Sequence, residues 1–218
     1  MSRSTCFALL ACLCLIAALP AFAGEIYENG PINGDSDAWT INFGFIVSDT
    51  FTIAGGNSTI TGVSFGVWLF IGDELNTVEV SLTSNENGGT VYFDQTVAFT
   101  TSNCGGNSYG YNLCTASGSF NGPTLGNGTY WLNLQNATLL NGDDPVYWDE
   151  NSGEGCHSPG CPSLASENTV GTIPSESFTI LGTSSTTTTT GTVPEPGSLM
   201  LFAGGALSIA SLLRRKLG

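Results

Sequence analysis

The chain has 218 residues and a formal net charge of -14, with 18 Asp and Glu, four Lys and Arg, and one His. The four basic residues all lie near the chain ends, so residues 24–192 carry 17 acidic side chains and no Lys or Arg. A domain of this charge repels phosphate backbones, which excludes nucleic acid as a partner. Divalent cations, water and backbone amides are the remaining partners for its carboxylates.

Residues 1–23 are typical of a secretory signal peptide. One charged residue, Arg3, precedes an uncharged run from Cys6 to Leu19, and Ala21-Phe22-Ala23 supplies small residues at the spacing of a cleavage site. The uncharged run is shorter than the roughly 20 residues that span a bilayer as a helix. We therefore predict export, with cleavage by signal peptidase after Ala23.

Four cysteines remain after cleavage, and they would enter an oxidising compartment: Cys104, Cys114, Cys156 and Cys161. Four cysteines allow three pairings, and the sequence does not choose among them. The short spacings favour Cys104 with Cys114 and Cys156 with Cys161, as staples of two Gly-rich loops.

Residues 24–182 are long enough for one domain and repeat their apolar residues with a period of two, which indicates strands. The clearest runs cover residues 39–47 and 63–71, and shorter runs occur at 78–82, 91–93, 97–99, 130–134, 146–148 and 178–180. Clusters of Gly, Asn and Asp separate them as turns. About eight or nine short strands predict an all-β, antiparallel, two-sheet β-sandwich, most simply a jelly roll.

The domain has few groups suited to catalysis. His157 is its single histidine, and a metal site beside it would need reduced thiols from Cys156 and Cys161. No Gly-x-Ser-x-Gly motif supplies a nucleophile. Paired carboxylates keep a glycosidase as the weaker alternative, drawn from Asp143, Asp144, Asp149, Glu150 and Glu154. Because no basic residue is available to orient a substrate, we predict that the protein is not an enzyme.

Two ligand hypotheses remain. Asp35, Asp37, Asp143 and Asp144 offer oxygen ligands of the kind that calcium binds, and simple solvation of these side chains is the alternative. A structural calcium is thus the one cofactor considered. For a glycan, Tyr147 and Trp148 beside Asp149 are the best candidates to stack on a sugar ring and read its hydroxyls, and packing of Trp148 in the core is the alternative.

The C-terminal part begins with a Ser/Thr-rich linker at residues 183–193, followed by a sorting or anchoring segment at 194–218. This segment contains Pro194-Glu195-Pro196, an uncharged stretch at 197–213, and the basic cluster Arg214-Arg215-Lys216. A helix over 197–213 would extend about 26 Å, so we predict that it just spans a membrane. The basic cluster would then stay in the cytoplasm, with the acidic domain outside.

This three-part tail resembles the PEP-CTERM sorting domain of Gram-negative bacteria. The resemblance implies that Pro194, Glu195 and Pro196 are recognised by an exosortase, a membrane protease that processes its substrate and passes it to the surface or its exopolysaccharide. The two prolines would keep the site extended. We thus expect an exported, non-catalytic cell-surface or extracellular-matrix protein, anchored in the inner membrane before processing, with exopolysaccharide as candidate partner. A carbohydrate-binding module with a defined glycan is the alternative.

Overall fold

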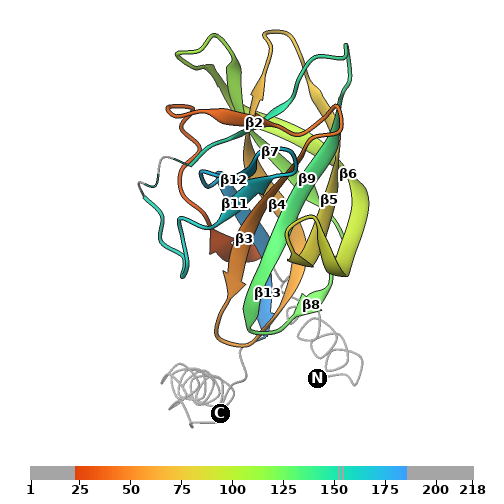
Figure 1. Cartoon of the computed structure of the whole chain (residues 1–218), viewed down its shortest axis with the longest axis vertical. Helices are drawn as coiled ribbons and strands as arrows, with labels where there is room; N and C mark the ends of the chain where they lie inside the picture. The colour runs from red at the N-terminus through yellow and green to blue at the C-terminus, as the bar shows by residue number, and fades with distance from the viewer. Residues whose placement is uncertain (1–22, 152, 154, 186–218) are drawn as a thin grey trace, which may run out of the picture. The chain divides into compact units, whose positions relative to one another are not determined.

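The computed structural model describes residues 23–151, 153 and 155–185 (Figure 1). The chain divides into two compact units, residues 1–186 and 187–218, and every described residue belongs to the first. The signal peptide up to residue 22, Pro194-Glu195-Pro196, the predicted helix at 197–213 and the basic cluster lie outside the described residues. The part of the chain that is described has no helix long and apolar enough to cross a membrane.

The described unit is built from strands. In chain order they are β1 (Gly24–Glu28), β2 (Ala38–Thr40), β3 (Ile46–Ile53), β4 (Asn57–Leu69), β5 (Leu75–Asn85), β6 (Gly88–Gly106), β7 (Asn112–Ser119), β8 (Thr124–Leu125), β9 (Gly128–Leu139), β10 (Tyr147–Asp149), β11 (Ala165–Glu167), β12 (Gly171–Ile173) and β13 (Phe178–Ser185).

The strands pair in the order β1-β13-β4-β7-β6-β5-β9-β3-β11-β12, with β10 joining β2 to β4 and β8 pairing with β4. The 19-residue β6 joins the two parts of this sheet, because its first half pairs with β5 and its second half with β7. All pairings are antiparallel, which confirms the predicted all-β antiparallel class. The prediction of two separate sheets in a jelly roll differs from the structure, which has one curled sheet because β6 continues from one part into the other.

The core follows the period of two. Inward-facing side chains of β4, β5 and β9 are fully buried: Val63, Phe65, Val67, Val78, Val80, Leu82, Leu132 and Leu134. They come from both parts of the sheet, so burial of their apolar surface holds the two parts together. The runs at 91–93 and 97–99, predicted as separate strands, are both parts of β6.

The predicted strand at 39–47 is interrupted. Phe43 and Gly44 take positive φ angles of 58° and 88°, and the Phe45 N–H donates to the carbonyl of Asn42 at 3.1 Å. A turn therefore separates β2 from β3, and Phe43 is 55% exposed. The apolar alternation continues through this turn, so it could not reveal the break.

The predicted linker also begins later than residue 183. Thr183, Ser184 and Ser185 belong to β13 and pair with Thr59, Ser58 and Asn57 of β4. These pairs are made by backbone groups and need no apolar side chain, which explains why composition alone assigned the segment to the linker.

The two ends of the sheet carry different parts of the chain. At one end Ser185, the last described residue, pairs with Asn57. At the other end Leu69 pairs with Asn112, beside the turns at 70–74 and 107–111. We call this second end the distal end. Strand β4 connects the two ends, and its 13 residues, at about 3.3 Å each, separate them by roughly 40 Å.

Candidate functional site

Aromatic side chains from three strand regions meet at the distal end. Tyr109 stacks on Trp68 with ring centroids 5.1 Å apart, and Tyr111 lies 5.7 Å from Trp68 and 5.5 Å from Tyr147. Register brings them together, since Tyr147 of β10 pairs directly with Trp68 of β4. With Asp37 and Ala38 these four rings line a pocket of about 150 Å³. We call it the aromatic pocket.

The buried carboxylate of Asp149 fixes Trp68, the innermost ring of the aromatic pocket. The Trp68 Nε1–H donates to Asp149 Oδ1 at 2.6 Å, and Asp149 also accepts from the Ser177 hydroxyl at 3.1 Å and the Asn33 N–H at 3.2 Å. Asp149 is fully buried. Burial raises the pKa of its carboxyl, and the hydrogen bonds from Trp68, Ser177 and the backbone lower it. Asp149 thus positions Trp68 and has no surface exposed to a ligand.

The outer wall of the pocket is a tight turn. The Asn107 side-chain oxygen accepts from the N–H groups of Tyr109 at 3.1 Å and Tyr111 at 3.0 Å, and the Asn107 N–H donates to the Tyr111 carbonyl at 2.9 Å. The Tyr109 hydroxyl donates to the Ser36 carbonyl at 2.7 Å. Tyr109 is therefore held at its backbone N–H and at its side-chain hydroxyl, although the residue is 53% exposed.

The disulfide between Cys104 and Cys114 closes this hairpin, and a second disulfide joins Cys156 to Cys161. These are the pairings that the short spacings favoured. His157 lies in the second loop and is exposed.

The predicted sugar-binding group at residues 147–149 is divided by the structure. Trp148 is fully buried, with its ring edge-on to Phe65 at 5.9 Å and Phe178 at 5.6 Å, and its Nε1–H donates to the Ser177 carbonyl at 2.9 Å. Trp148 is thus a core residue, which confirms the packing alternative and rules out this side chain as a ligand platform. Only Tyr147 lines the pocket, because adjacent residues of a strand face opposite sides.

Sequence reasoning missed Trp68, Tyr109 and Tyr111. Trp68 appeared to be a core residue of a long strand, and it is indeed only 4% exposed. The detectable signal was Tyr109-Gly110-Tyr111 inside a Gly-rich loop between two cysteines, where aromatic residues have no core to fill.

The structure does not unite the predicted calcium ligands. Asp35 and Asp37 are exposed before β2, and Asp37 Oδ1 accepts the N–H of Ala38 at 2.8 Å. Asp143 and Asp144 lie in the loop between β9 and β10. Among residues 23–151, 153 and 155–185, no group of three or more His, Cys, Asp or Glu is placed to hold a metal ion.

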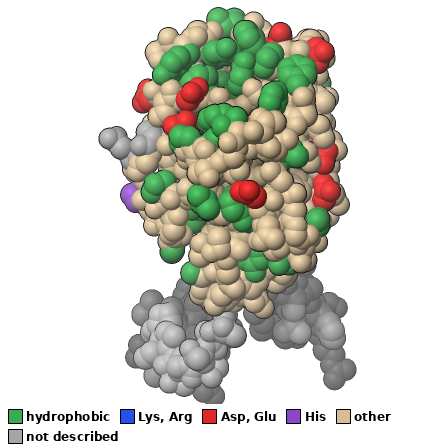
Figure 2. Space-filling model, in the orientation of Figure 1, with side chains coloured by type: hydrophobic (Ala, Val, Ile, Leu, Met, Phe, Trp, Pro, Cys, Tyr) green, Lys and Arg blue, Asp and Glu red, His purple; other side chains and the backbone are tan. Residues whose placement is uncertain are grey.

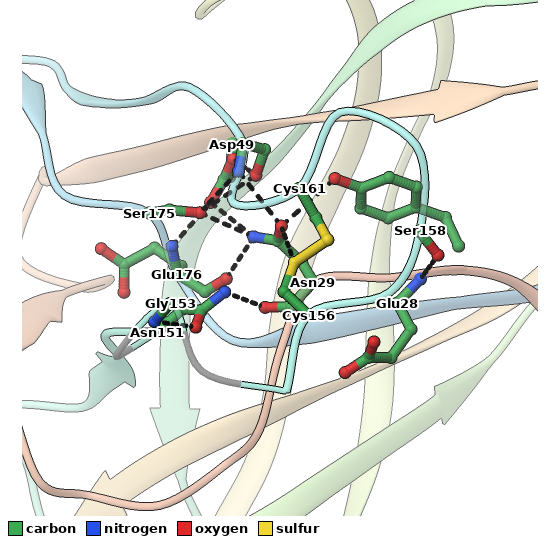
Figure 3. Close-up of a disulfide and its surroundings, with 12 residues drawn as sticks. Glu28, Asn29, Asp49, Asn151, Gly153, Cys156, Ser158, Cys161, Ser175 and Glu176 are labelled. Carbon is green, nitrogen blue, oxygen red and sulfur yellow. Dashed lines mark hydrogen bonds between the residues drawn. A yellow bond between two sulfur atoms is a disulfide. The ribbon is translucent and has the colours of Figure 1, made fainter.

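Other carboxylates are buried in the core. Asp49 accepts from the Ser163 hydroxyl, from the Ser175 hydroxyl at 3.2 Å and from the Glu176 N–H at 2.6 Å (Figure 3). Burial raises the pKa of Asp49 to about 7, against the lowering effect of these bonds. Beside it, Asn29 donates to Ser175 Oγ at 2.7 Å and accepts the Ser163 N–H at 3.2 Å, beneath the Cys156–Cys161 loop.

Glu176 has the fewest hydrogen bonds to its side chain among these buried carboxylates. Its side chain is fully buried, and neither carboxylate oxygen has a hydrogen-bond partner. Burial, and then repulsion by Asp49 and Glu150, raises the pKa of Glu176 well above its usual range. Residues 24–192 contain no Lys or Arg that could pair with this carboxyl, so burial disfavours its charged form. We call Asp49, Asp149 and Glu176 the buried acid group.

Comparison with known proteins identifies the C-terminal region. Residues 192–216 match the family model described as the PEP-CTERM protein-sorting motif. No curated protein matches the chain. The match covers the tail and leaves the β domain without an assigned family. The chain therefore carries, at residues 192–216, the PEP-CTERM protein-sorting motif that its Pro-Glu-Pro tail resembles.

Proposed function

We propose that this is an exported cell-surface or extracellular-matrix protein, processed by an exosortase, whose β domain is non-catalytic and associates with exopolysaccharide. The sorting motif at residues 192–216 carries the first part of this proposal. In this view the 197–213 segment anchors the protein in the inner membrane until it is processed near Pro194-Glu195-Pro196.

The chemistry of the domain supports a non-catalytic role. His157 is exposed in a loop, and the four cysteines of the domain are paired in disulfides. Asp49, Asp149 and Glu176 are fully buried, so they offer no carboxylate to a substrate in a cleft. Residues 24–192 also lack a Lys or Arg that could orient a substrate.

The sorting proposal is tested in cells by replacing Pro194→Ala and Glu195→Ala together. We expect the variant to keep its tail and to stay in the membrane fraction, while the parent protein is shortened and reaches the surface. Thr189→Ala with Thr190→Ala, in the linker, is the matched control and should be processed normally. Unchanged length and location of the Pro194/Glu195 variant would refute dependence on an exosortase.

A second candidate function for the same domain is a carbohydrate-binding module. The aromatic pocket favours it, since a fixed, exposed aromatic ring beside half-buried rings and a carboxylate is typical of sites that stack on sugars and bind their hydroxyls.

A further inference from the structure

We propose that the aromatic pocket binds uncharged pyranose units of a polysaccharide, with Tyr109, Tyr111 and Tyr147 as the stacking residues and Asp37 as the hydroxyl acceptor. This inference rests on the proposed role in the exopolysaccharide. It adds the ligand class, the residues that contact the ligand and the end of the domain that carries the site.

The first argument is the rigidity of an exposed ring. Tyr109 is 53% exposed, yet the Asn107 side chain holds its backbone and the Ser36 carbonyl holds its hydroxyl. An aromatic side chain that is already fixed loses little conformational entropy on binding, which makes it an efficient contact surface. The disulfide at the base of the hairpin, Cys104–Cys114, adds to this preorganisation.

The second argument is the composition of the pocket. Its walls are the rings of Trp68, Tyr109, Tyr111 and Tyr147, and its polar groups are the Asp37 carboxylate and tyrosine hydroxyls. Its volume of about 150 Å³ suits a single ring-sized group. Apolar faces combined with a few hydrogen-bonding groups match a pyranose, which presents C–H groups on its faces and hydroxyls around its edge.

The third argument is charge. Asp37 is exposed at the pocket, and the whole domain carries carboxylates without any Lys or Arg in residues 24–192. Uronates, sulfated sugars and phosphorylated sugars would be repelled, and no basic side chain could pair with them. The charge of the domain thus selects against anionic sugars.

The fourth argument is the position of the pocket. Among the described residues, six of the ten exposed large hydrophobic side chains lie at the distal end or in the neighbouring turn before β3: Phe43, Phe45, Phe70, Ile71, Tyr109 and Leu140. Figure 2 shows hydrophobic side chains gathered at this end, with acidic ones around them. Phe70 is 38% exposed and packs edge-on against Tyr111 at 5.0 Å, so stacking surface continues beyond the pocket. A chain of several sugar units can therefore extend across this end, roughly 40 Å from Ser185, the last described residue.

The test is binding of the full chain, purified in a mild detergent, to three polysaccharides measured side by side: an uncharged glucan, anionic alginate and cationic chitosan. We expect binding to the glucan, with a loss of affinity of at least about tenfold for Tyr109→Ala and for Tyr111→Ala. Tyr109→Phe keeps the ring and should lose less than about threefold. Tyr92→Ala is the matched control, because Tyr92 is 39% exposed and lies outside the pocket.

Each other outcome would overturn the inference. These outcomes are no glucan binding by the parent protein, glucan binding that both alanine variants retain, and binding to alginate alone. Binding to chitosan alone that disappears in salt would reflect the overall negative charge. Capture of a second copy of the chain through the Phe70 surface, without glucan binding, would make this end a protein interface. The sorting proposal is checked separately, by measuring whether the Tyr109→Ala variant still reaches the cell surface.

Discussion

Raising the pH from about 4 to about 8 should destabilise this protein, because burial raises the pKa of the Asp49 carboxyl when the protein folds. The pKa of Asp49 rises from 3.8 to about 7 on folding. Between these values the folded state binds more protons than the unfolded state, so the free energy of unfolding falls as the pH rises. A difference of about three pH units, at about 1.4 kcal/mol each, amounts to about 4 kcal/mol for Asp49 alone.

Glu176 acts in the same direction, since burial and its acidic neighbours raise its pKa well above the usual range. A loss of about 4 kcal/mol is a large share of the 5–15 kcal/mol that stabilises a typical domain, and corresponds to about 10 °C in Tm for a chain of this size. The protein should therefore melt higher at pH 4.5 than at pH 8.

The assay is thermal unfolding followed by circular dichroism across this pH range, in about 0.5 M NaCl. Salt screens repulsion between exposed carboxylates but hardly affects the cost of charging a buried one. Glu176→Gln keeps the side chain uncharged at every pH, so this variant should melt higher than the parent protein at pH 8 and depend less on pH. Glu86→Gln alters an exposed residue and is the control. A Tm that stays constant or rises between pH 4.5 and pH 8 in high salt would refute the reasoning.

Two further predictions concern the aromatic residues and the disulfides. Trp148→Ala should lower the free energy of unfolding by about 3–5 kcal/mol in urea denaturation, because it opens a cavity between Phe65 and Phe178; a change below about 1 kcal/mol would contradict its core position. Cys104→Ser with Cys114→Ser removes a bond between residues 10 apart in sequence and should cost about 2–3 kcal/mol. The same double variant should loosen the Tyr109 turn, seen as faster amide exchange at residues 107–111 than in a Cys156→Ser, Cys161→Ser variant.

The sequence predicted the strand-rich class because its period of two is a local property, readable wherever one face is buried. Val63, Phe65 and Val67 are buried as their alternation predicts. The continuity of the sheet was not readable, because it depends on β6 pairing with β5 along one half and β7 along the other. Such pairing is decided by partners far away in sequence.

Trp148 shows where local reasoning about the site fails. Tyr147 and Trp148 are adjacent in sequence and were assigned one role, although neighbouring residues of a strand point to opposite sides. Once Tyr147 faces the pocket, Trp148 must face the core. The true partners of Tyr147 are Trp68, which lies opposite it in the pairing of β10 with β4, and Tyr111. No spacing within a single segment could have indicated this group.

The charge pattern was fully visible in the sequence, but its physical consequence depends on burial. Seventeen acidic residues without a basic partner suggested either calcium or a solvated surface. The structure adds a third environment, since Asp49, Asp149 and Glu176 are fully buried and burial raises the pKa of each carboxyl. Because Asp149 also holds the Trp68 indole, the absence of basic residues affects the aromatic pocket as well: a Lys or Arg paired with Asp149 would compete for the oxygen that fixes Trp68.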